Sequence, residues 1–243
     1  MPSAATVFFF LFAPVFGLAV TLAAWHLWPT PSQADRYELG LLVFVCLSSV
    51  HVYVTIAAGW GRRCAYSGWG AMRGVALAVR YEIPLVVVFL GAGIGFRGWD
   101  IREIVAGGAA GLPLLSLVAF MGVGVFSLLV IEFNRAPFDL IEAESELVSG
   151  FNTEFGATGF VLLFLAEYAQ ILVGCQVLAV IFFGGAVRWV GLVVVGMVLS
   201  WGVLVARARY PRTKVGTVIS ACWKRYITVV LCFLLVMCTV FLR

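Results

Sequence analysis

The chain has 243 residues, of which 63% are hydrophobic and only 12% are charged, and its mean hydropathy is +1.08. In soluble globular domains about a quarter of the residues are charged, so this composition excludes that class and indicates a polytopic membrane protein. The arginines stand between apolar runs and form no basic patch interleaved with aromatic residues, so the net charge of +4 does not indicate nucleic-acid binding. The six cysteines form no CxxC pair and show no metal-ligand spacing, so we expect no metal site.

The apolar runs predict an all-α fold of about seven transmembrane helices, because a helix needs about 20 apolar residues to cross the hydrocarbon layer. All of residues 1–243 then form a single transmembrane helical domain. The predicted spans are 4–28, 39–58, 69–95, 112–131, 155–183, 187–206 and 217–241. The loops on the N-terminal side hold more basic residues than those on the other side, so the positive-inside rule assigns them to the cytoplasm or matrix.

One inside loop, residues 132–154, is far more acidic than the rest of the chain. It holds six of the twelve acidic residues and one arginine, which gives it a formal charge of −5 against +9 for the remainder. These residues are Glu132, Arg135, Asp139, Glu142, Glu144, Glu146 and Glu154.

Part of this loop has the pattern of a short helix. Asp139 followed by Glu142 fits a helix N-cap with its capping partner, and Pro137 just before them marks the end of the preceding segment. A solvated, well-capped loop helix would explain this spacing by itself. However, Glu142 and Glu146 would repel each other on one face, and the flanking residues are strongly apolar. We therefore favour a segment that packs against protein or lines a wet cavity.

Two further acidic residues lie inside predicted spans. Glu82 is about 13 residues into the third span and Glu167 about 12 residues into the fifth, which places both deep in the membrane. A carboxylate at that depth costs several kcal/mol unless it is paired, hydrated or protonated, so such residues usually have a function. The structural alternative is a buried ion pair with Arg73 or Arg80, although Arg80 points to a different helix face from Glu82.

The inside loop also carries a family resemblance. The run Glu132-Phe-Asn-Arg-Ala-Pro-Phe-Asp-Leu140, with Glu142, the run Glu144-Ser-Glu-Leu-Val-Ser-Gly-Phe-Asn152 and Glu154, resembles the signature loop of chain 1 of NADH:ubiquinone oxidoreductase, the quinone-site membrane subunit of respiratory complex I. Shorter segments resemble the same family in the same order along essentially the whole chain. They are Ser48-Ser49, Gly59-Trp60, Gly70-Ala-Met-Arg73, Tyr81-Glu82, Ala166-Glu-Tyr168, Arg207-Ala-Arg-Tyr-Pro-Arg212 and Trp223-Lys224.

Some features depart from the family pattern. The family's usual first helix and first inside loop do not occur in this sequence, so we expect that part of the quinone entrance to come from a separate polypeptide or to be absent. Leu77 and Arg80 replace a usual glutamine and serine, and the segment 213–215 lacks a usual aspartate.

The resemblance implies a structural and proton-conducting subunit without a redox centre of its own. Ubiquinone would be the substrate, reached through a tunnel lined partly by this chain, and FMN and iron–sulfur clusters would lie in partner subunits. The six loop acids would lie at the quinone end, Glu82 and Glu167 would pass protons or charge along the membrane, and Arg135 would hold the loop by pairing with a carboxylate. Arg73 and Tyr168 would support them.

The resemblance also implies the surroundings of the chain. Its partners would be hydrophilic quinone-site and iron–sulfur subunits, neighbouring membrane subunits and lipids, and no nucleic acid. We expect the mitochondrial inner membrane, with the bacterial plasma membrane as the alternative. Two other functions remain open: a proton- or cation-coupled secondary transporter, which would also use mid-membrane acids, and a degenerate assembly scaffold.

Overall fold

The structure is a computed structural model and describes residues 4–28, 37–61, 65–96, 98–106, 122, 124–139, 141, 155–184, 187 and 189–241. Its regular elements in these ranges are helices, and six of them are long and apolar enough to cross a membrane. The predicted all-α polytopic membrane class is therefore confirmed.

The six long helices match six of the seven predicted spans. They are α1 (Ala4–His26), α2 (Gly40–Trp60), α3 (Ala65–Phe96), α7 (Ala157–Phe183), α8 (Trp189–Arg209) and a last span formed by α9 (Val215–Ala221), the π-helical turn η2 (Cys222–Tyr226) and α10 (Ile227–Phe241). A short helix, α4 (Ile101–Ala106), follows α3. The predicted span 112–131 falls largely outside the described residues, and its described end belongs to a helix over residues 124–132.

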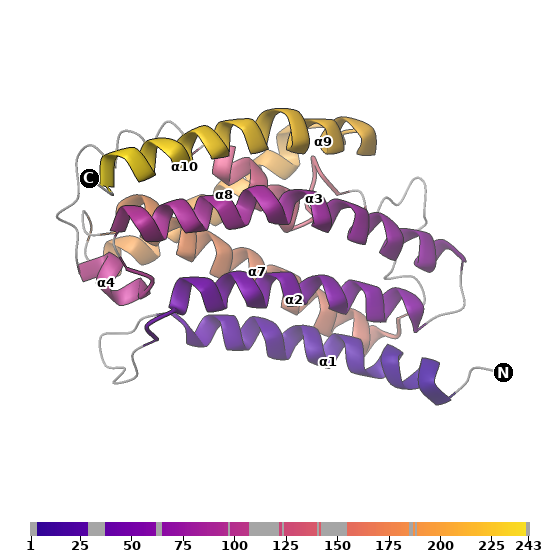
Figure 1. The fold of residues 1–243 in the computed structure, drawn as a ribbon. Coiled ribbons are helices and arrows are strands. Elements are labelled where there is room, and N and C mark those ends of the chain that lie inside the picture. Colours follow the sequence, from indigo (N-terminus) through magenta and orange to yellow (C-terminus); the bar gives the residue numbers. More distant parts are fainter. Residues whose placement is uncertain are drawn as a thin grey trace.

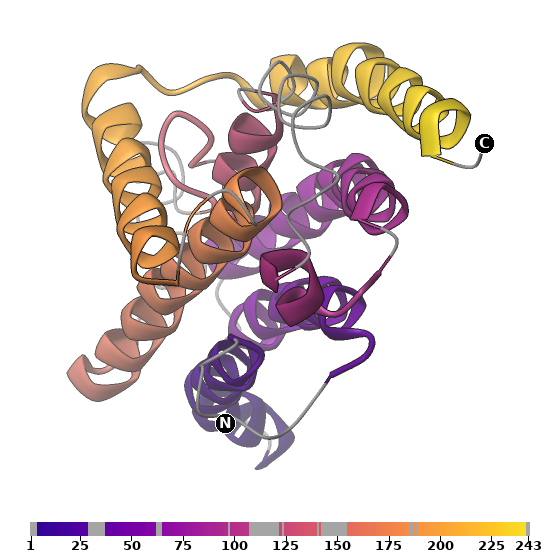
Figure 2. The same ribbon diagram turned by 90° about the vertical axis from the view of Figure 1, so that its left-hand side faces the viewer.

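Four of the long helices lie side by side in the order α1, α2, α3, α10 (Figure 1). Viewed from the end, α7 and α8 lie to one side of this row, and α7 packs against both α1 and α8 (Figure 2). The helix over residues 124–132 is enclosed by protein, since Val125, Leu128, Leu129, Val130 and Ile131 are all buried. A helix that is apolar and buried all round is a core helix, and this one ends where the acidic loop begins.

Small residues let the helices approach closely, as is usual in membranes, where small side chains rather than a hydrophobic driving force bring helices together. A Cβ atom on Gly59 of α2 would collide with the Cβ of Ala71 on α3. One on Gly174 of α7 would lie 2.5 Å from the ring of Phe133. These two contacts fix the distances of α3 and of the 124–132 helix from their neighbours, and so position the polar residues between them.

Candidate functional site

The chain turns sharply after the helix over residues 124–132. Asn134 adopts a left-handed conformation (φ 50°), which asparagine tolerates better than most residues, and its Nδ2 donates a hydrogen bond to the Glu132 carbonyl at 3.3 Å. Pro137, three residues later, has no backbone N–H and cannot continue a helix. The turn leaves Glu132 inside the bundle and directs Arg135 towards α7.

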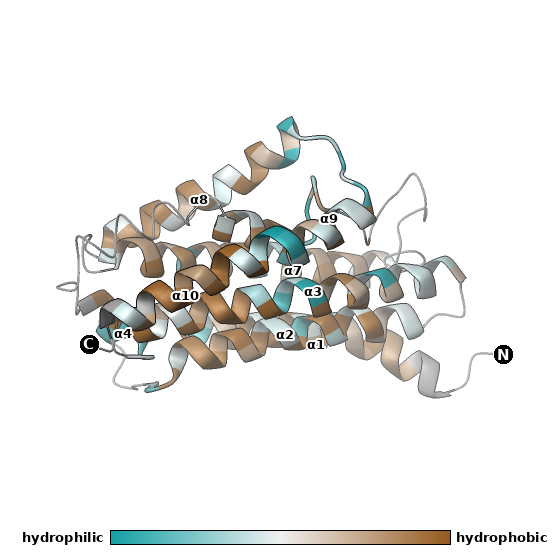
Figure 3. Ribbon diagram, turned by 45° about the horizontal axis from the view of Figure 1, so that its top comes forward, coloured by the Kyte–Doolittle hydropathy of each residue, from teal (hydrophilic) through white to brown (hydrophobic). Residues whose placement is uncertain are grey.

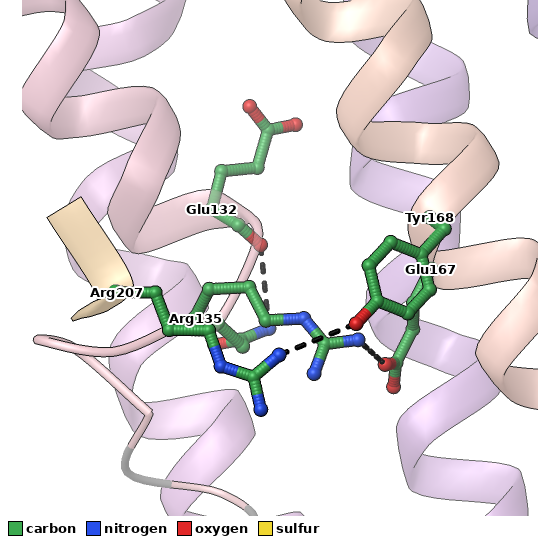
Figure 4. A network of polar contacts seen from close by, with 6 residues as sticks. Glu132, Arg135, Glu167, Tyr168 and Arg207 are labelled. Atoms are coloured by element: carbon green, nitrogen blue, oxygen red, sulfur yellow. Dashed lines mark hydrogen bonds and ion pairs between the residues drawn. The ribbon is translucent and has the colours of Figure 1, made fainter. Parts of the chain in front are cut away.

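Arg135 forms a buried ion pair with Glu167 of α7. The Arg135 Nη2 atom lies 2.6 Å from Glu167 Oε2, and the two side chains are only 5% and 16% exposed. The guanidinium carbon of Arg135 also lies 4.8 Å from the ring centre of Tyr168, a cation–π contact. Glu167, the acidic residue of the fifth predicted span, is therefore a pairing partner of Arg135, which the sequence leaves open (Figure 4).

The Tyr168 side chain extends this network to α8. Arg207 Nη1, near the end of α8, donates a hydrogen bond to the Tyr168 hydroxyl at 3.2 Å. One arginine thus lies over the aromatic ring and a second binds its hydroxyl (Figure 4). The supporting role predicted for Tyr168 has a physical basis here, since it joins the inside turn to two membrane helices.

Glu132 lies apart from this ion pair. Its carboxylate points away from Arg135 into the bundle (Figure 4), the residue is 8% exposed, and Ser48 of α2 lies close to the side chain. Its Oε2 atom is buried and has no hydrogen-bond partner in the described structure. The sequence assigns Glu132 to the loop, whereas the structure places it at the last turn of a buried helix.

Two small polar cavities connect the surroundings of Glu132 with Glu167. Each has a volume of about 20 Å³, and both are lined by His51, Thr55, Glu132, Asn134 and Gln170. The first continues to Ser48 and Tyr81, and the second continues to Glu167. A cavity of this volume holds one or two water molecules where polar groups line it.

Three buried polar atoms on these walls have no hydrogen-bond partner among the described residues. They are Nε2 of His51, Oε2 of Glu132 and Oδ1 of Asn134. Buried polar atoms that lack a protein partner are usually satisfied by ordered water, and the cavities offer the space for it. The geometry therefore fits a hydrated polar path from Glu132 to Glu167 within the helix bundle.

Glu82 extends the acidic group on α3. It is half-buried and close enough to Glu132 for the two carboxylates to interact electrostatically, and its neighbour Tyr81 is buried and lines the first cavity. Arg80 lies beside Cys222 of η2, and Arg73 is half-buried closer to the inside end of α3. The ion pair that the structure shows for a membrane acid joins Glu167 to Arg135.

The beginning of the acidic loop is fastened to the segment between α8 and α9. Asp139 Oδ2 accepts a hydrogen bond from Arg212 Nη2 at 2.9 Å, and the Thr213 backbone N–H and hydroxyl both donate to the Pro137 carbonyl at 3.0 Å. Ile141 is buried against Gly74 of α3. The remaining predicted loop residues, Glu142, Glu144, Glu146 and Glu154, lie outside the described residues, so the predicted capping of Asp139 by Glu142 does too.

The sequence reading missed His51, Thr55 and Gln170 as members of the site. A signal was present, since each is a polar residue inside an apolar span. Spacing along the sequence could not show that these three side chains line the same cavities, because they belong to α2 and α7, which are far apart in the chain. Among the described residues, no group of three His, Cys, Asp or Glu side chains could hold a metal ion.

Comparison with known proteins identifies the family. A family model described as NADH dehydrogenase matches residues 1–238. The NADH-ubiquinone oxidoreductase chain 1 of Mytilus edulis is 37% identical over 236 residues, which cover 97% of this chain and 75% of that protein. Those of Artemia franciscana and Carassius auratus are 36% and 35% identical over 93% and 96% of this chain, and 74% of each is covered. The chain therefore belongs to the family of chain 1 of NADH:ubiquinone oxidoreductase, the membrane subunit of respiratory complex I.

Proposed function

We propose that the chain lines part of the quinone tunnel of complex I and couples quinone reduction to proton movement. The observation that carries this proposal is the pair of small polar cavities between Glu132 and Glu167, which lie inside a helix bundle next to the start of the acidic loop. Such cavities have no structural need in an apolar bundle. Their polar side chains are costly there, and intramembrane acidic residues generally mark ion or proton pathways.

The loop residues respond first in this scheme. Reduction of ubiquinone to ubiquinol consumes two electrons and two protons, and the electrons would come from an iron–sulfur cluster in a partner subunit. When the loop carboxylic acids at the quinone end give up protons to the reduced quinone, their negative charge increases. Because neighbouring carboxylates titrate as a coupled group, that change shifts the proton affinity of Glu132 and Glu82.

The path residues then move protons between fixed positions. Water beside Glu132 Oε2 and His51 Nε2 can exchange protons with both atoms, since both border the same cavities and neither has a hydrogen-bond partner among the described residues. At the other end, Arg135 holds the Glu167 side chain in place, and a change in the loop can pull on Arg135 directly because they share one turn. The ion pair is thus the mechanical link between loop and membrane helix.

The quinone ring itself would lie outside these cavities. Sites for small molecules generally have volumes of about 300–1,000 Å³, whereas each cavity here measures about 20 Å³. The substrate would therefore meet the chain at the loop over residues 132–154 and at the hydrophilic quinone-site subunit. We place the chain in the mitochondrial inner membrane, as the animal relatives support.

Replacement of loop acids tests this function in the intact complex. Glu144→Gln and Glu146→Gln should lower quinone-dependent NADH oxidation and leave NADH oxidation by a hydrophilic artificial acceptor unchanged, because that acceptor takes electrons upstream of the quinone site. Glu103→Gln, an exposed residue of α4, serves as the matched control. Equal loss of both activities would indicate failed assembly, and unchanged activities would support the scaffold alternative and refute the proposal.

The secondary-transporter alternative makes a different prediction. A transporter works without other subunits, so the purified chain reconstituted into vesicles would show substrate or cation flux. The proposed function predicts no such flux from the isolated chain.

A further inference from the structure

The last membrane span carries two positive charges on its outer surface. The π-helical turn η2 contains Lys224 and Arg225, and both side chains are exposed. Two other residues of this turn face inwards: Cys222 is buried, and the Tyr226 hydroxyl lies 2.6 Å from that of Ser127. These inward contacts fix the orientation of the turn, so Lys224 and Arg225 point away from the bundle.

The two charges lie well inside the span. The span formed by α9, η2 and α10 runs from Val215 to Phe241, and Lys224 is nine residues from the first and seventeen from the second. At about 1.5 Å per residue these distances correspond to roughly 13 Å and 25 Å along the helix. Lysine side chains can snorkel towards the membrane surface, but a stem of four methylene groups is shorter than either distance.

The surroundings of the turn are apolar. The hydrophilic turn between α9 and α10 stands out on the outer surface of the span, bordered by hydrophobic α10 (Figure 3). Val229 and Leu231, which follow it, are exposed. Arg80 of α3 lies near Cys222 and adds a third positive charge behind the turn. Among the described residues, the structure shows no carboxylate paired with Lys224, Arg225 or Arg80.

We propose that this face, formed by η2 and the adjoining part of α3, is the docking surface for a transmembrane helix of another subunit that carries a carboxylate at the same depth. Unpaired cations that face hydrocarbon are rare, and charged residues in membranes generally pair with one another. A lipid phosphate lies at the membrane surface, too far away to neutralise charges this deep in the span. An acidic side chain on a neighbouring helix meets both requirements, charge and depth.

Cross-linking of the intact complex tests the contact, because Lys214 and Lys224 are the only lysines in the sequence. In a Lys214→Arg background, a membrane-permeant carbodiimide would activate the partner carboxylate, and Lys224 Nζ would attack its carbonyl carbon. An amide bond forms, and the carboxylate oxygen leaves in the urea derived from the reagent. The expected product joins Lys224 to an acidic residue in a transmembrane peptide of another subunit, and it disappears when Lys224→Arg is added.

Subunit retention provides an independent measurement. The double variant Lys224→Gln/Arg225→Gln should co-purify with about tenfold less of the cross-linked subunit, as expected when one side of a buried charge pair is removed. Arg209→Gln, at the exposed end of α8, should retain it. Absence of the Lys224 cross-link, or full retention of every subunit by the double variant, would overturn the proposal. The proposal would also be overturned if the double variant lost bound anionic lipid and kept every subunit.

Discussion

The ion pair between Arg135 and Glu167 should stabilise the complex measurably, because it anchors the inside turn to α7. The Arg135→Met change leaves the Glu167 carboxylate poorly solvated, and breaking a buried pair in this way costs about 3–5 kcal/mol. Since the Glu167 side chain is 16% exposed and borders a polar cavity, we expect the lower end, about 3 kcal/mol. Loss of the cation–π contact with Tyr168 adds about 1 kcal/mol.

A double variant separates the two contributions. Arg135→Met/Glu167→Leu removes both charges, so only the cation–π loss of about 1 kcal/mol should remain. The assay is the thermal midpoint of the assembled complex, followed by native electrophoresis so that loss of activity does not affect the result. Arg209→Met, on an exposed part of α8, controls for loss of a surface arginine.

The expected order of thermal midpoints is specific. Each single variant should lie well below the wild type, and the double variant should recover most of the difference. If the double variant were destabilised by the sum of the two single effects, Arg135 and Glu167 would not be coupled. The turn would then be held by other contacts, such as that between Asp139 and Arg212.

Three further substitutions test the packing around the site. Gly59→Ala should destabilise the complex by about 1–3 kcal/mol through overpacking against Ala71, whereas Gly68→Ala, where a Cβ meets nothing within 4 Å, should not lower the thermal midpoint. Tyr226→Phe removes the hydrogen bond to the 124–132 helix and should cost about 0.5–1.5 kcal/mol in the same thermal assay. Asp139→Asn should change stability by no more than about 1 kcal/mol and preserve quinone-dependent NADH oxidation, because its partly exposed pair with Arg212 is weak and it lies off the hydrated path. A large loss of that activity with normal assembly would show that Asp139 takes part in coupling.

Most of the fold could be predicted from the sequence because membrane helices follow a simple rule of length and apolarity. Six predicted spans correspond to helices, with ends that differ by a few residues. The largest difference at a helix start is in α3, which begins at Ala65 rather than at residue 69. Its first turn is less apolar, and hydropathy alone does not register residues that extend the helix beyond the hydrocarbon layer. The π-helical turn was not predicted, since its wider winding depends on tertiary contacts such as that between Tyr226 and Ser127.

The site was only partly predictable, for a physical reason. An acidic residue in an apolar span is visible in the sequence, and so Glu82 and Glu167 were identified. The partner of Glu167 could not be identified, because Arg135 reaches it only after Asn134 has turned the chain. The depth of Glu132 depends on where its helix ends, and the cavity wall shared by α2 and α7 depends on where the fold places those two helices.

The most direct test of the proposed coupling is proton movement by the complex with Glu132→Gln. This change keeps the size of the side chain and removes the group that can exchange a proton with the cavity. In sealed vesicles, the account predicts that NADH oxidation by a hydrophilic artificial acceptor persists while quinone-dependent oxidation and proton movement both fall steeply, with Glu103→Gln unchanged. Undiminished quinone-dependent oxidation and proton movement by the Glu132→Gln complex would contradict the account.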